Sequence, residues 1–368
     1  MKISRIITII IGLTFLLVYS CQESEEIIVA EHDETEKGDT LINEYAKAFR
    51  IIEYSSKHVI EVLSPNNDFE VLESYIISKK ENSSYNSFQP NKISSIIPLS
   101  STHIGMLNKL EAKDLIIGVS AKNLLCSPLP NSVAEVGELG NSDLELLVSL
   151  RPDVIIYSGF NRDMPILKKL RDSNIKTFMN YEWQETHPLG RAEWIKVLGL
   201  LIGKEQIALE QFQKVKSNYE ALLAFSKEIN EKPSVVAGTP YGDIFHAPAG
   251  NSYLAQLIND AGGDYVYKST EGTASISKTY EQIISENKST QFWLNPAAKD
   301  KLGVLNLHSS FDKLNAFSES MYSYFHNVNC FWENSAIEPD RLLSDLISIF
   351  HSSSSKSKVK LHYYRLLE

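Results

Sequence analysis

The sequence predicts an α/β protein of two lobes that are joined by one long backbone helix and preceded by an N-terminal β-hairpin addition. Short apolar strands alternate with helical segments before residue 187, and the same alternation restarts after Pro233. Between these parts, Glu205 to Ile229 contains neither proline nor glycine. A helix of about 25 residues is roughly 37 Å long, the span of a domain. We therefore expect this helix to run from one lobe to the other.

The composition is that of a globular protein. Of the 368 residues, 43% are hydrophobic and 22% are charged, and the formal net charge is -10. These values exclude a wholly disordered or fibrous chain. The acidic balance, without a run of lysine and arginine, argues against a nucleic-acid partner. Three cysteines are too few for a disulfide scaffold or a cysteine-rich zinc module.

Residues 1–20 are predicted to be a lipoprotein signal peptide. A basic start is followed by a mostly apolar run, Ile6 to Val18, which is shorter than the roughly 20 residues that span a bilayer. The run ends in Val-Tyr-Ser-Cys, which resembles the lipobox of bacterial lipoproteins. This implies that Cys21 is lipidated and becomes the first mature residue.

Residues 21–40 are predicted to be an acidic, disordered tether. They are rich in aspartate and glutamate and show no apolar periodicity, so like charges repel and little apolar area can be buried. The body would then be anchored to a bacterial membrane and face the periplasm or the cell exterior.

The elements of the N-terminal lobe, residues 41–187, follow from the apolar pattern. Alternation in 48–64 and 69–80 around a Pro-Asn-Asn-Asp turn predicts the β-hairpin addition. Four short strands are expected at 93–99, 115–119, 154–157 and 176–179, with helices at 103–110, 142–150 (capped by Ser142) and 164–171. Strands that alternate with helices over short connections predict a parallel sheet, whose ligands lie at the carboxyl ends of its strands.

The remainder divides into a helical segment, 188–230, a C-terminal lobe, 231–353, and a tail, 354–368. Pro188 suits the first turn of a helix, and Gly203 interrupts the pattern before the long backbone helix. In the C-terminal lobe the pattern predicts strands at 235–237 and 291–294 and helices at 251–261, 277–284, 311–316 and 339–350. Residues 361–367 are expected to dock as a short element.

Five segments carry a resemblance to a known family: IIPLSSTHIGMLNKLEAKDLIIGVS (96–120), DLELLVSLRPDVII (143–156), THPLGRAEWIKVLGLLIGKEQIA (186–208), APAGNSYLAQLINDAGGDYVY (247–267) and FWENSAIEPDRLLSDLISIFH (331–351). On these segments the chain resembles the helical-backbone substrate-binding proteins of ABC importers, which handle iron–siderophores and cobalamin. The resemblance implies two Rossmann-like lobes with the ligand between them and little hinge motion. It also implies an ABC permease and its ATPase as partners, a monomeric state and no cofactor.

The resemblance also assigns residues for docking to the permease. Two glutamates, one in each lobe, correspond to those that bind permease arginines in this family, and they map to Glu145 and Glu281. Each lies near the start of a predicted helix, where the helix dipole favours an acid. The alternative for both is an ordinary solvated helix face.

Ligand contacts are expected just after the strands, where bulky chelates would meet aromatic faces and polar tips. The predicted contacts are Thr102, His103, Tyr157, Trp183, Arg191, Tyr241, Asp243, Tyr253 and Trp332. Thr102 and His103 could instead belong to a helix start, where we expect Ser101 to act as the cap. Arg191 could bind an anionic group or pair with Glu193 or another acid, and each aromatic residue taken singly could belong to the core.

These residues predict a binding protein for a metal chelate. A ferric siderophore is the first choice, followed by cobalamin and heme. Bare zinc or manganese is an alternative ligand, because His103, His187, His246 and His326 could converge, although no HxxxH or HxH spacing occurs.

Catalysis has little support, because no GxSxG, P-loop, CxxC or strand-associated GxGxxG is present. A lipid-anchored enzyme or adhesion module on the same fold remains the alternative from another class. Cys126 and Cys330 are expected to be buried free thiols, since their places in different lobes mean that a bond would lock the cleft.

Overall fold

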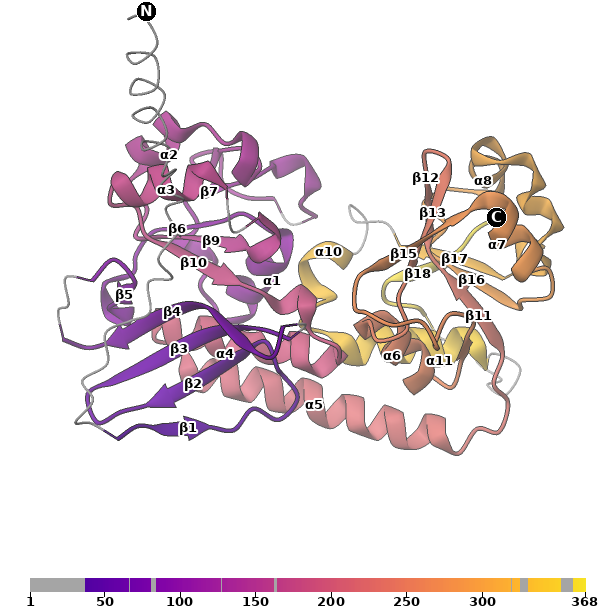
Figure 1. Cartoon of the computed structure of the whole chain (residues 1–368), viewed down its shortest axis with the longest axis horizontal. Helices are drawn as coiled ribbons and strands as arrows, with labels where there is room; N and C mark the ends of the chain where they lie inside the picture. The colour runs from indigo at the N-terminus through magenta and orange to yellow at the C-terminus, as the bar shows by residue number, and fades with distance from the viewer. Residues whose placement is uncertain are drawn as a thin grey trace, which may run out of the picture.

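The computed structural model describes residues 37–368 except 66, 81–83, 127, 162–163, 319, 325–329 and 352–359. The predicted signal peptide, the lipidation site Cys21 and most of the predicted tether lie outside this part of the chain. Two α/β lobes lie side by side above a pair of long helices (Figure 1). No helix in the described residues is both long and apolar enough to cross a membrane.

The N-terminal addition is a five-stranded sheet rather than a lone hairpin. Its strands lie in chain order: β1 (Asp39–Leu41), β2 (Phe49–Glu53), β3 (Lys57–Ser64), β4 (Glu70–Ser78) and β5 (Ser87–Phe88). The predicted hairpin is confirmed as β3 and β4, but the predicted strand 48–64 is wrong as one element, because the chain turns after Glu53 and divides it into β2 and β3. β1 begins inside the segment predicted to be tether.

Two buried carboxylates hold the chain that leads into this sheet. Glu193 accepts hydrogen bonds from the backbone N–H groups of residues 44–46 at 2.8–2.9 Å, and Glu185 accepts from those of residues 47 and 48 at 2.8 and 2.9 Å. A buried carboxylate is costly unless it is hydrogen-bonded, so this match favours one position of the segment. The sheet is therefore fixed to the body through five backbone donors.

The N-lobe (residues 41–187) has a parallel sheet in the order β10-β9-β6, formed by β6 (Ile96–Pro98), β9 (Val154–Ser158) and β10 (Thr177–Asn180). A smaller parallel pair, β7 (Gly118–Val119) and β8 (Ala134–Glu135), lies beside it, and the helices are α1 (Ser101–Lys109), α2 (Leu144–Leu150) and α3 (Pro165–Asp172). Two predicted caps are wrong. Ser100, not Ser101, caps α1, and Asp143, not Ser142, caps α2, because their side chains accept from the first-turn N–H groups.

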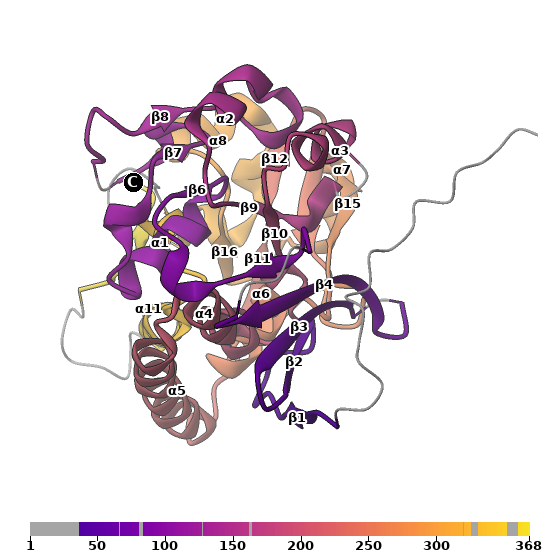
Figure 2. The same ribbon diagram turned by 90° about the vertical axis from the view of Figure 1, so that its left-hand side faces the viewer.

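The predicted backbone helix is α5 (Glu205–Lys227), and it is preceded by a second helix, α4 (Pro188–Ile202), in the segment between the lobes. α4 ends at Gly203, whose φ of 72° is left-handed, and α5 follows. α5 runs beneath both lobes (Figure 1). Phe212 packs in the hydrophobic core of the N-lobe, whereas Tyr219 packs in that of the C-lobe (residues 231–368). Seen from the side, α4 lies between α5 and the five-stranded sheet (Figure 2).

The C-lobe contains a sheet in the order β14-β11-β16-β17-β18: β14 (Asp264–Tyr265), β11 (Ser234–Ala237), β16 (Phe292–Leu294), β17 (Met321–Tyr324) and β18 (Tyr364–Leu366). β18 pairs with β17, which confirms the predicted docking of 361–367, and it is the only strand of this sheet that runs antiparallel to its neighbour. The surrounding helices are α6 (Tyr253–Asp260), α7 (Tyr280–Glu286), α8 (Lys301–Leu307) and α11 (Pro339–Phe350).

A second, antiparallel sheet in the C-lobe was not predicted. It consists of β12 (Thr239–Tyr241), β13 (Ile244–Pro248) and β15 (Ser275–Thr279). The predicted helix 277–284 is wrong in its first turn, because Thr279 still pairs with Ile244 and then caps α7. The helix predicted at 311–316 is instead two short 3-10 turns.

A short helix of the C-terminal half returns to the N-lobe. α10 (Phe331–Asn334) packs against α1, so closely that a Cβ on Gly105 would lie 1.6 Å from the backbone oxygen of Glu333. Lys109 at the end of α1 also forms a 2.6 Å ion pair with Glu338. Residues 330–338 therefore contact both lobes: Ala336 and Ile337 pack in the N-lobe core, whereas Phe331 packs in the C-lobe core.

The expectation of two free thiols is wrong. Cys126 and Cys330 form a disulfide with their Cα atoms 5.1 Å apart. Because Cys330 directly precedes α10, which packs against α1 while Phe331 packs in the C-lobe core, the bond ties the segment at Cys126 to a helix that contacts both lobes. Its structural effect is to attach the loop around residues 120–126 to α10.

Gly105→Ala is expected to destabilise the protein by about 3 kcal/mol, because the added methyl group meets backbone rather than a flexible side chain. Urea denaturation followed by circular dichroism measures the loss. Gly140→Ala is the matched control, since its Cβ would meet only the mobile end of Met164 at 3.0 Å. Equal stabilities of the two variants would contradict the close packing of α1 and α10.

Candidate functional site

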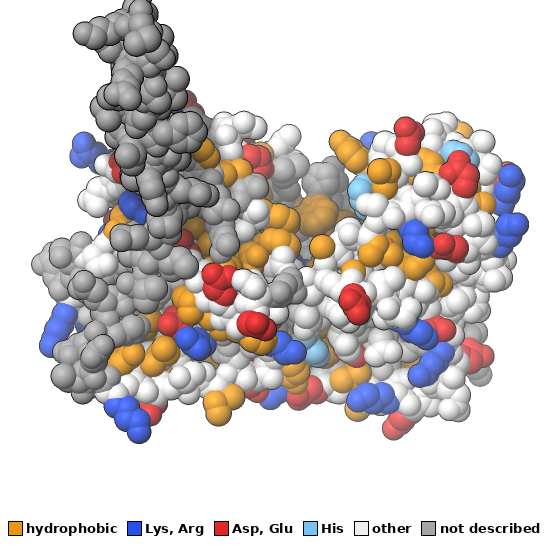
Figure 3. Space-filling model, in the orientation of Figure 1, with side chains coloured by type: hydrophobic (Ala, Val, Ile, Leu, Met, Phe, Trp, Pro, Cys, Tyr) orange, Lys and Arg blue, Asp and Glu red, His pale blue; other side chains and the backbone are white. Residues whose placement is uncertain are grey.

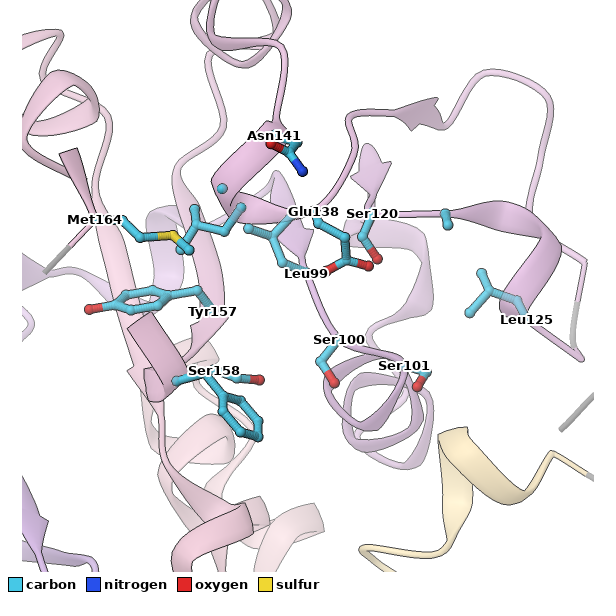
Figure 4. A pocket seen from close by; sticks show the side chains of 14 residues that line it. Leu99, Ser100, Ser101, Ser120, Leu125, Glu138, Asn141, Tyr157, Ser158 and Met164 are labelled. Carbon is cyan, nitrogen blue, oxygen red and sulfur yellow. The ribbon is translucent and has the colours of Figure 1, made fainter. Parts of the chain in front are cut away.

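The molecular surface is hollowed between the upper parts of the two lobes (Figure 3). On the N-lobe side, a cavity of about 470 Å³ lies at the carboxyl ends of β6 and β9. Its lining includes Ser100 and Ser101 from the start of α1, Ser120 and Glu138 (Figure 4). Phe160 also lines it. This is the edge at which parallel α/β sheets bind their ligands, as the alternation of strands and helices predicted.

The serines at the start of α1 reach this cavity, whereas two residues predicted to bind ligand do not line it. Ser100 and Ser101 are among its lining residues. Thr102 is half-buried, and its hydroxyl hydrogen-bonds with that of Ser100 at 2.9 Å. His103 is completely buried and so cannot touch a ligand in this conformation. Burial lowers the pKa of His103 to about 4, although Glu182 and the backbone of Ile156 act in the opposite direction.

Aromatic rings form one wall of the cleft. Trp183 stacks in parallel on Phe160 with ring centroids 3.8 Å apart, and Tyr181 meets Trp183 edge-on at 5.3 Å. Phe160 is 66% exposed, which leaves ring surface available to a bulky ligand. Sequence reasoning missed Phe160, although it follows β9 and the same strand-end rule that selected Tyr157 would have found it.

Tyr157 contributes less to this wall than predicted. It belongs to β9 and lines the cavity, but only 1% of the residue is exposed. Burial raises the pKa of its hydroxyl, which lies beside Tyr75 in the N-lobe core. In Figure 4 the hydroxyl points away from Glu138 and Ser120.

Arg191 forms the floor between the lobes. Its guanidinium pairs with Glu182 at 2.6 Å and lies over the ring of Tyr253, 4.0 Å from its centroid. Although burial alone would lower it, Glu182 and Tyr253 raise the pKa of Arg191 above its ordinary value. Of the two predicted roles, the structure therefore shows the ion pair, but with Glu182. The carboxylate of Glu193 instead pairs with Lys196 and the N-terminal segment.

The C-lobe contributes the second wall. The β12–β13 hairpin rises on the side of the C-lobe that faces the N-lobe (Figure 1). Tyr241 at the end of β12 is 78% exposed, and Asp243 in the turn is also exposed. Phe245, which follows in β13, is buried in the core. Trp332 on α10 is 43% exposed and meets Tyr324 edge-on.

The two predicted docking glutamates are both exposed. Glu145 lies in the first turn of α2 and Glu281 in the first turn of α7. Both helices lie in the upper half of the molecule, one in each lobe (Figure 1). Hydrogen bonds from its own backbone N–H and from Thr279 lower the pKa of Glu281. These glutamates are therefore accessible to a partner.

The predicted histidine set does not assemble in the described part of the chain. His103 is buried, while the ring of His187 caps α4 by accepting from the N–H of Leu189 at 3.1 Å. His246 lies in β13, and His326 lies outside the described residues. The donor atoms that do lie together there, within 4.8 Å, belong to Cys126, Cys330 and Glu333, and these two cysteines are bonded to each other.

Residues 96–311 match the family model described as periplasmic binding protein. Among curated relatives, an uncharacterized lipoprotein of Methanocaldococcus jannaschii is 25% identical over 287 residues, covering 73% of this chain and 67% of the relative. A second uncharacterized lipoprotein of that organism is 24% identical over 228 residues, covering 60% of this chain and 58% of the relative. The match to the family model begins after the N-terminal sheet.

Solved structures with the same fold include a periplasmic heme-binding protein from Pseudomonas aeruginosa, with a TM-score of 0.57, 14% identity and coverage of 74% of this chain and 97% of that one. A possible iron-binding protein from Staphylococcus epidermidis has a TM-score of 0.55 and 19% identity, and the match covers 70% of this chain and 98% of that one. A vitamin B12-binding protein from Vibrio cholerae has a TM-score of 0.53 and 13% identity, and the match covers 72% of this chain and 98% of that one. At these identities the likeness shows the fold alone.

The buried His103 predicts a loss of stability in acid. Its folded-state pKa of about 4 lies below the ordinary 6.5, so only the unfolded chain takes up a proton as the pH falls from 6.5 towards 4. The stability due to neutral His103 is complete above pH 6.5 and should fall by roughly 3 kcal/mol across that window. Urea denaturation at pH 7.5, 6.5, 5.5 and 4.5 measures this loss.

His103→Met supplies the comparison, because methionine does not titrate in this range. Its unfolding free energy is expected to change less between pH 6.5 and 4.5 than that of the wild type, whatever the offset from altered packing. Parallel pH profiles for the two proteins would show that His103 is not responsible.

Proposed function

The chain belongs to the periplasmic binding protein family, and on that premise we propose that it captures a bulky metal chelate outside the cytoplasm and delivers it to an ABC permease. The observation that carries this proposal is the cavity at the carboxyl ends of β6 and β9, with the stacked pair Phe160 and Trp183 beside it. Large rings with exposed faces suit a ligand that is itself broad and partly apolar.

The arrangement supports capture without chemistry. Ring faces from the N-lobe and the exposed Tyr241 from the C-lobe provide apolar contact, while the serine hydroxyls at the start of α1 provide hydrogen bonds. The ion pair of Arg191 with Glu182 and its stacking on Tyr253 hold the floor between the lobes. A preorganised cleft loses little conformational entropy on binding.

A ferric siderophore is our first choice of ligand, with cobalamin and heme next. Structures of the same fold include proteins described as possibly iron-binding, heme-binding and vitamin B12-binding. The energy for uptake would come from the ATPase of the partner permease. Bare metal is a weaker candidate, because the described histidines form no group of donors and the cysteine pair is oxidised.

We also propose that the mature protein is a monomer anchored to the membrane by lipid at Cys21, outside the described residues. Curated relatives described as lipoproteins support this anchor. The acidic segment that follows would then act as the tether between the lipid and the body.

The mature chain, produced with Cys21→Ala to avoid lipidation, is expected to bind a ferric siderophore tightly and without turnover. Native mass spectrometry with a panel of chelates identifies the ligand, and tryptophan quenching gives the affinity. Trp183→Leu should weaken binding about tenfold, or about 1.4 kcal/mol, because a stacking surface is lost.

Phe225→Leu is the matched control, because this aromatic residue is 55% exposed but lies on α5, away from the cleft. The proposal fails if the panel of siderophores, cobalamin and heme gives no complex, or if the chelate is chemically converted. Equal losses in both variants would remove Trp183 from the binding wall.

The double variant Glu145→Ala/Glu281→Ala is expected to bind chelate normally but to lose at least tenfold in uptake, because both accessible docking carboxylates are absent. Uptake is measured in proteoliposomes that contain the partner permease and ATPase. Glu205→Ala is the control, since this acid also lies in the first turn of a helix but at the base of the molecule. Unchanged uptake in the double variant would disprove the docking assignment.

A further inference from the structure

Three side chains of the kind that bind metal ions lie together beside the cavity but outside its lining. The sulfur atoms of Cys126 and Cys330 and a carboxylate oxygen of Glu333 lie within 4.8 Å of one another. Glu333 is only 3% exposed, and both cysteines are half-buried. None of the three is among the residues that line the cavity. The two sulfur atoms are joined as a disulfide, so the group offers no thiolate in this oxidised state.

The two sides of this group are also held together by contacts other than the S–S bond. The carboxylate of Glu333 accepts a hydrogen bond from the backbone N–H of Cys126 at 2.7 Å. α10, which carries Glu333, packs so closely against α1 that no side chain fits on Gly105. The ion pair of Lys109 with Glu338 fastens the chain beyond α10 to the end of α1. We therefore expect the two thiols to stay close together after the bond between them is lost.

We propose that reduction converts this disulfide into a binding site for one zinc-like divalent ion, held by the thiolates of Cys126 and Cys330 and the carboxylate of Glu333. Three such ligands with water in the fourth position form a tetrahedral zinc site. At the usual bond lengths the donor atoms of such a site are about 3.6–3.8 Å apart. The most distant donors here would therefore approach by about 1 Å. This inference is independent of the proposed function.

The conversion takes place in two balanced steps. A dithiol reductant supplies two electrons that break the S–S bond, passes its two protons to the sulfur atoms of Cys126 and Cys330, and becomes a disulfide itself. The divalent ion then displaces both protons into solution and forms two metal–sulfur bonds and one bond to the carboxylate of Glu333. One covalent bond between the two segments is thus replaced by bonds through the metal.

The ion would link the same two segments that the disulfide links. Ser120, Ala121 and Leu125 lie in the segment that ends at Cys126, and they line the cavity. In the oxidised protein the disulfide attaches this segment to α10, and in the reduced protein the metal would attach it. Because the donors lie outside the cavity lining, the ion acts as a structural link rather than as transported cargo.

Cobalt(II) is the probe for this site, because tetrahedral cobalt bound to thiolates absorbs in the near ultraviolet and the visible, whereas zinc is colourless. The mature Cys21→Ala chain retains only Cys126 and Cys330 of the three cysteines. It is reduced with dithiothreitol, which is then removed by gel filtration without air, and its free thiols are counted. We expect cobalt bands in the reduced chain but not in the oxidised chain, with one cobalt ion bound per molecule.

Zinc should abolish the cobalt bands by displacement. It should also raise the unfolding temperature of the reduced chain, because it binds the folded state.

Glu333→Gln tests the carboxylate ligand and keeps both sulfur atoms. In the reduced chain it should weaken cobalt binding at least tenfold and shift the visible bands, because a neutral amide replaces a charged ligand. Glu111→Gln is the control, since it removes an exposed acid that follows α1 and should leave cobalt binding unchanged.

An absence of cobalt bands in the folded chain, after two free thiols have been counted, would overturn the proposal. Cobalt binding of equal strength in the Glu333→Gln and Glu111→Gln variants, or before and after reduction, would also overturn it. If the disulfide is reduced only when the chain unfolds, the site does not form in the folded protein and the proposal is rejected. Chelate binding is measured on the oxidised chain, so the proposed function is tested separately.

Discussion

The structure depends on the burial of α4, the helix on which both lobes and the N-terminal sheet converge. Nearly all of its residues are buried, including the charged Arg191 and Glu193. Each buried charge has a partner: Arg191 pairs with Glu182, and Glu193 binds Lys196 and three backbone N–H groups. Removing one partner would leave a charge without solvent or bond, so these pairings restrict how the surrounding parts can be arranged.

This constraint positions the candidate site. Glu185, in the segment just before α4, binds the segment before β2, and Arg191, one turn into the helix, reaches Tyr253 of the C-lobe. The walls of the cleft are thus attached to the buried helix α4, and α5 passes beneath both lobes. Such a frame holds the rings of Phe160 and Trp183 in place before a ligand arrives, which favours binding over large conformational change.

Much of the fold could be predicted because the local spacing of apolar residues and of helix-breaking residues specifies it. The uninterrupted stretch after Gly203 predicted α5, and the alternation of short strands with helices predicted the parallel sheet of the N-lobe. The β12–β13–β15 sheet was missed because its strands are short and β15 runs directly into α7, where the apolar spacing looks helical. Caps failed by one residue, since adjacent serine and aspartate side chains compete for the same N–H groups.

The sequence by itself determined the two-lobed α/β architecture, the backbone helix and the strand ends at which the candidate site lies, because hydrophobic periodicity and helix signals are local. Only the tertiary structure decided which side chains at those ends face the cleft. It buried His103 and most of Tyr157, exposed Phe160, paired Arg191 with Glu182 and joined Cys126 to Cys330. Each of these outcomes depends on packing between different segments of the chain. A single stretch of residues carries no signal for burial or charge pairing that arises in this way.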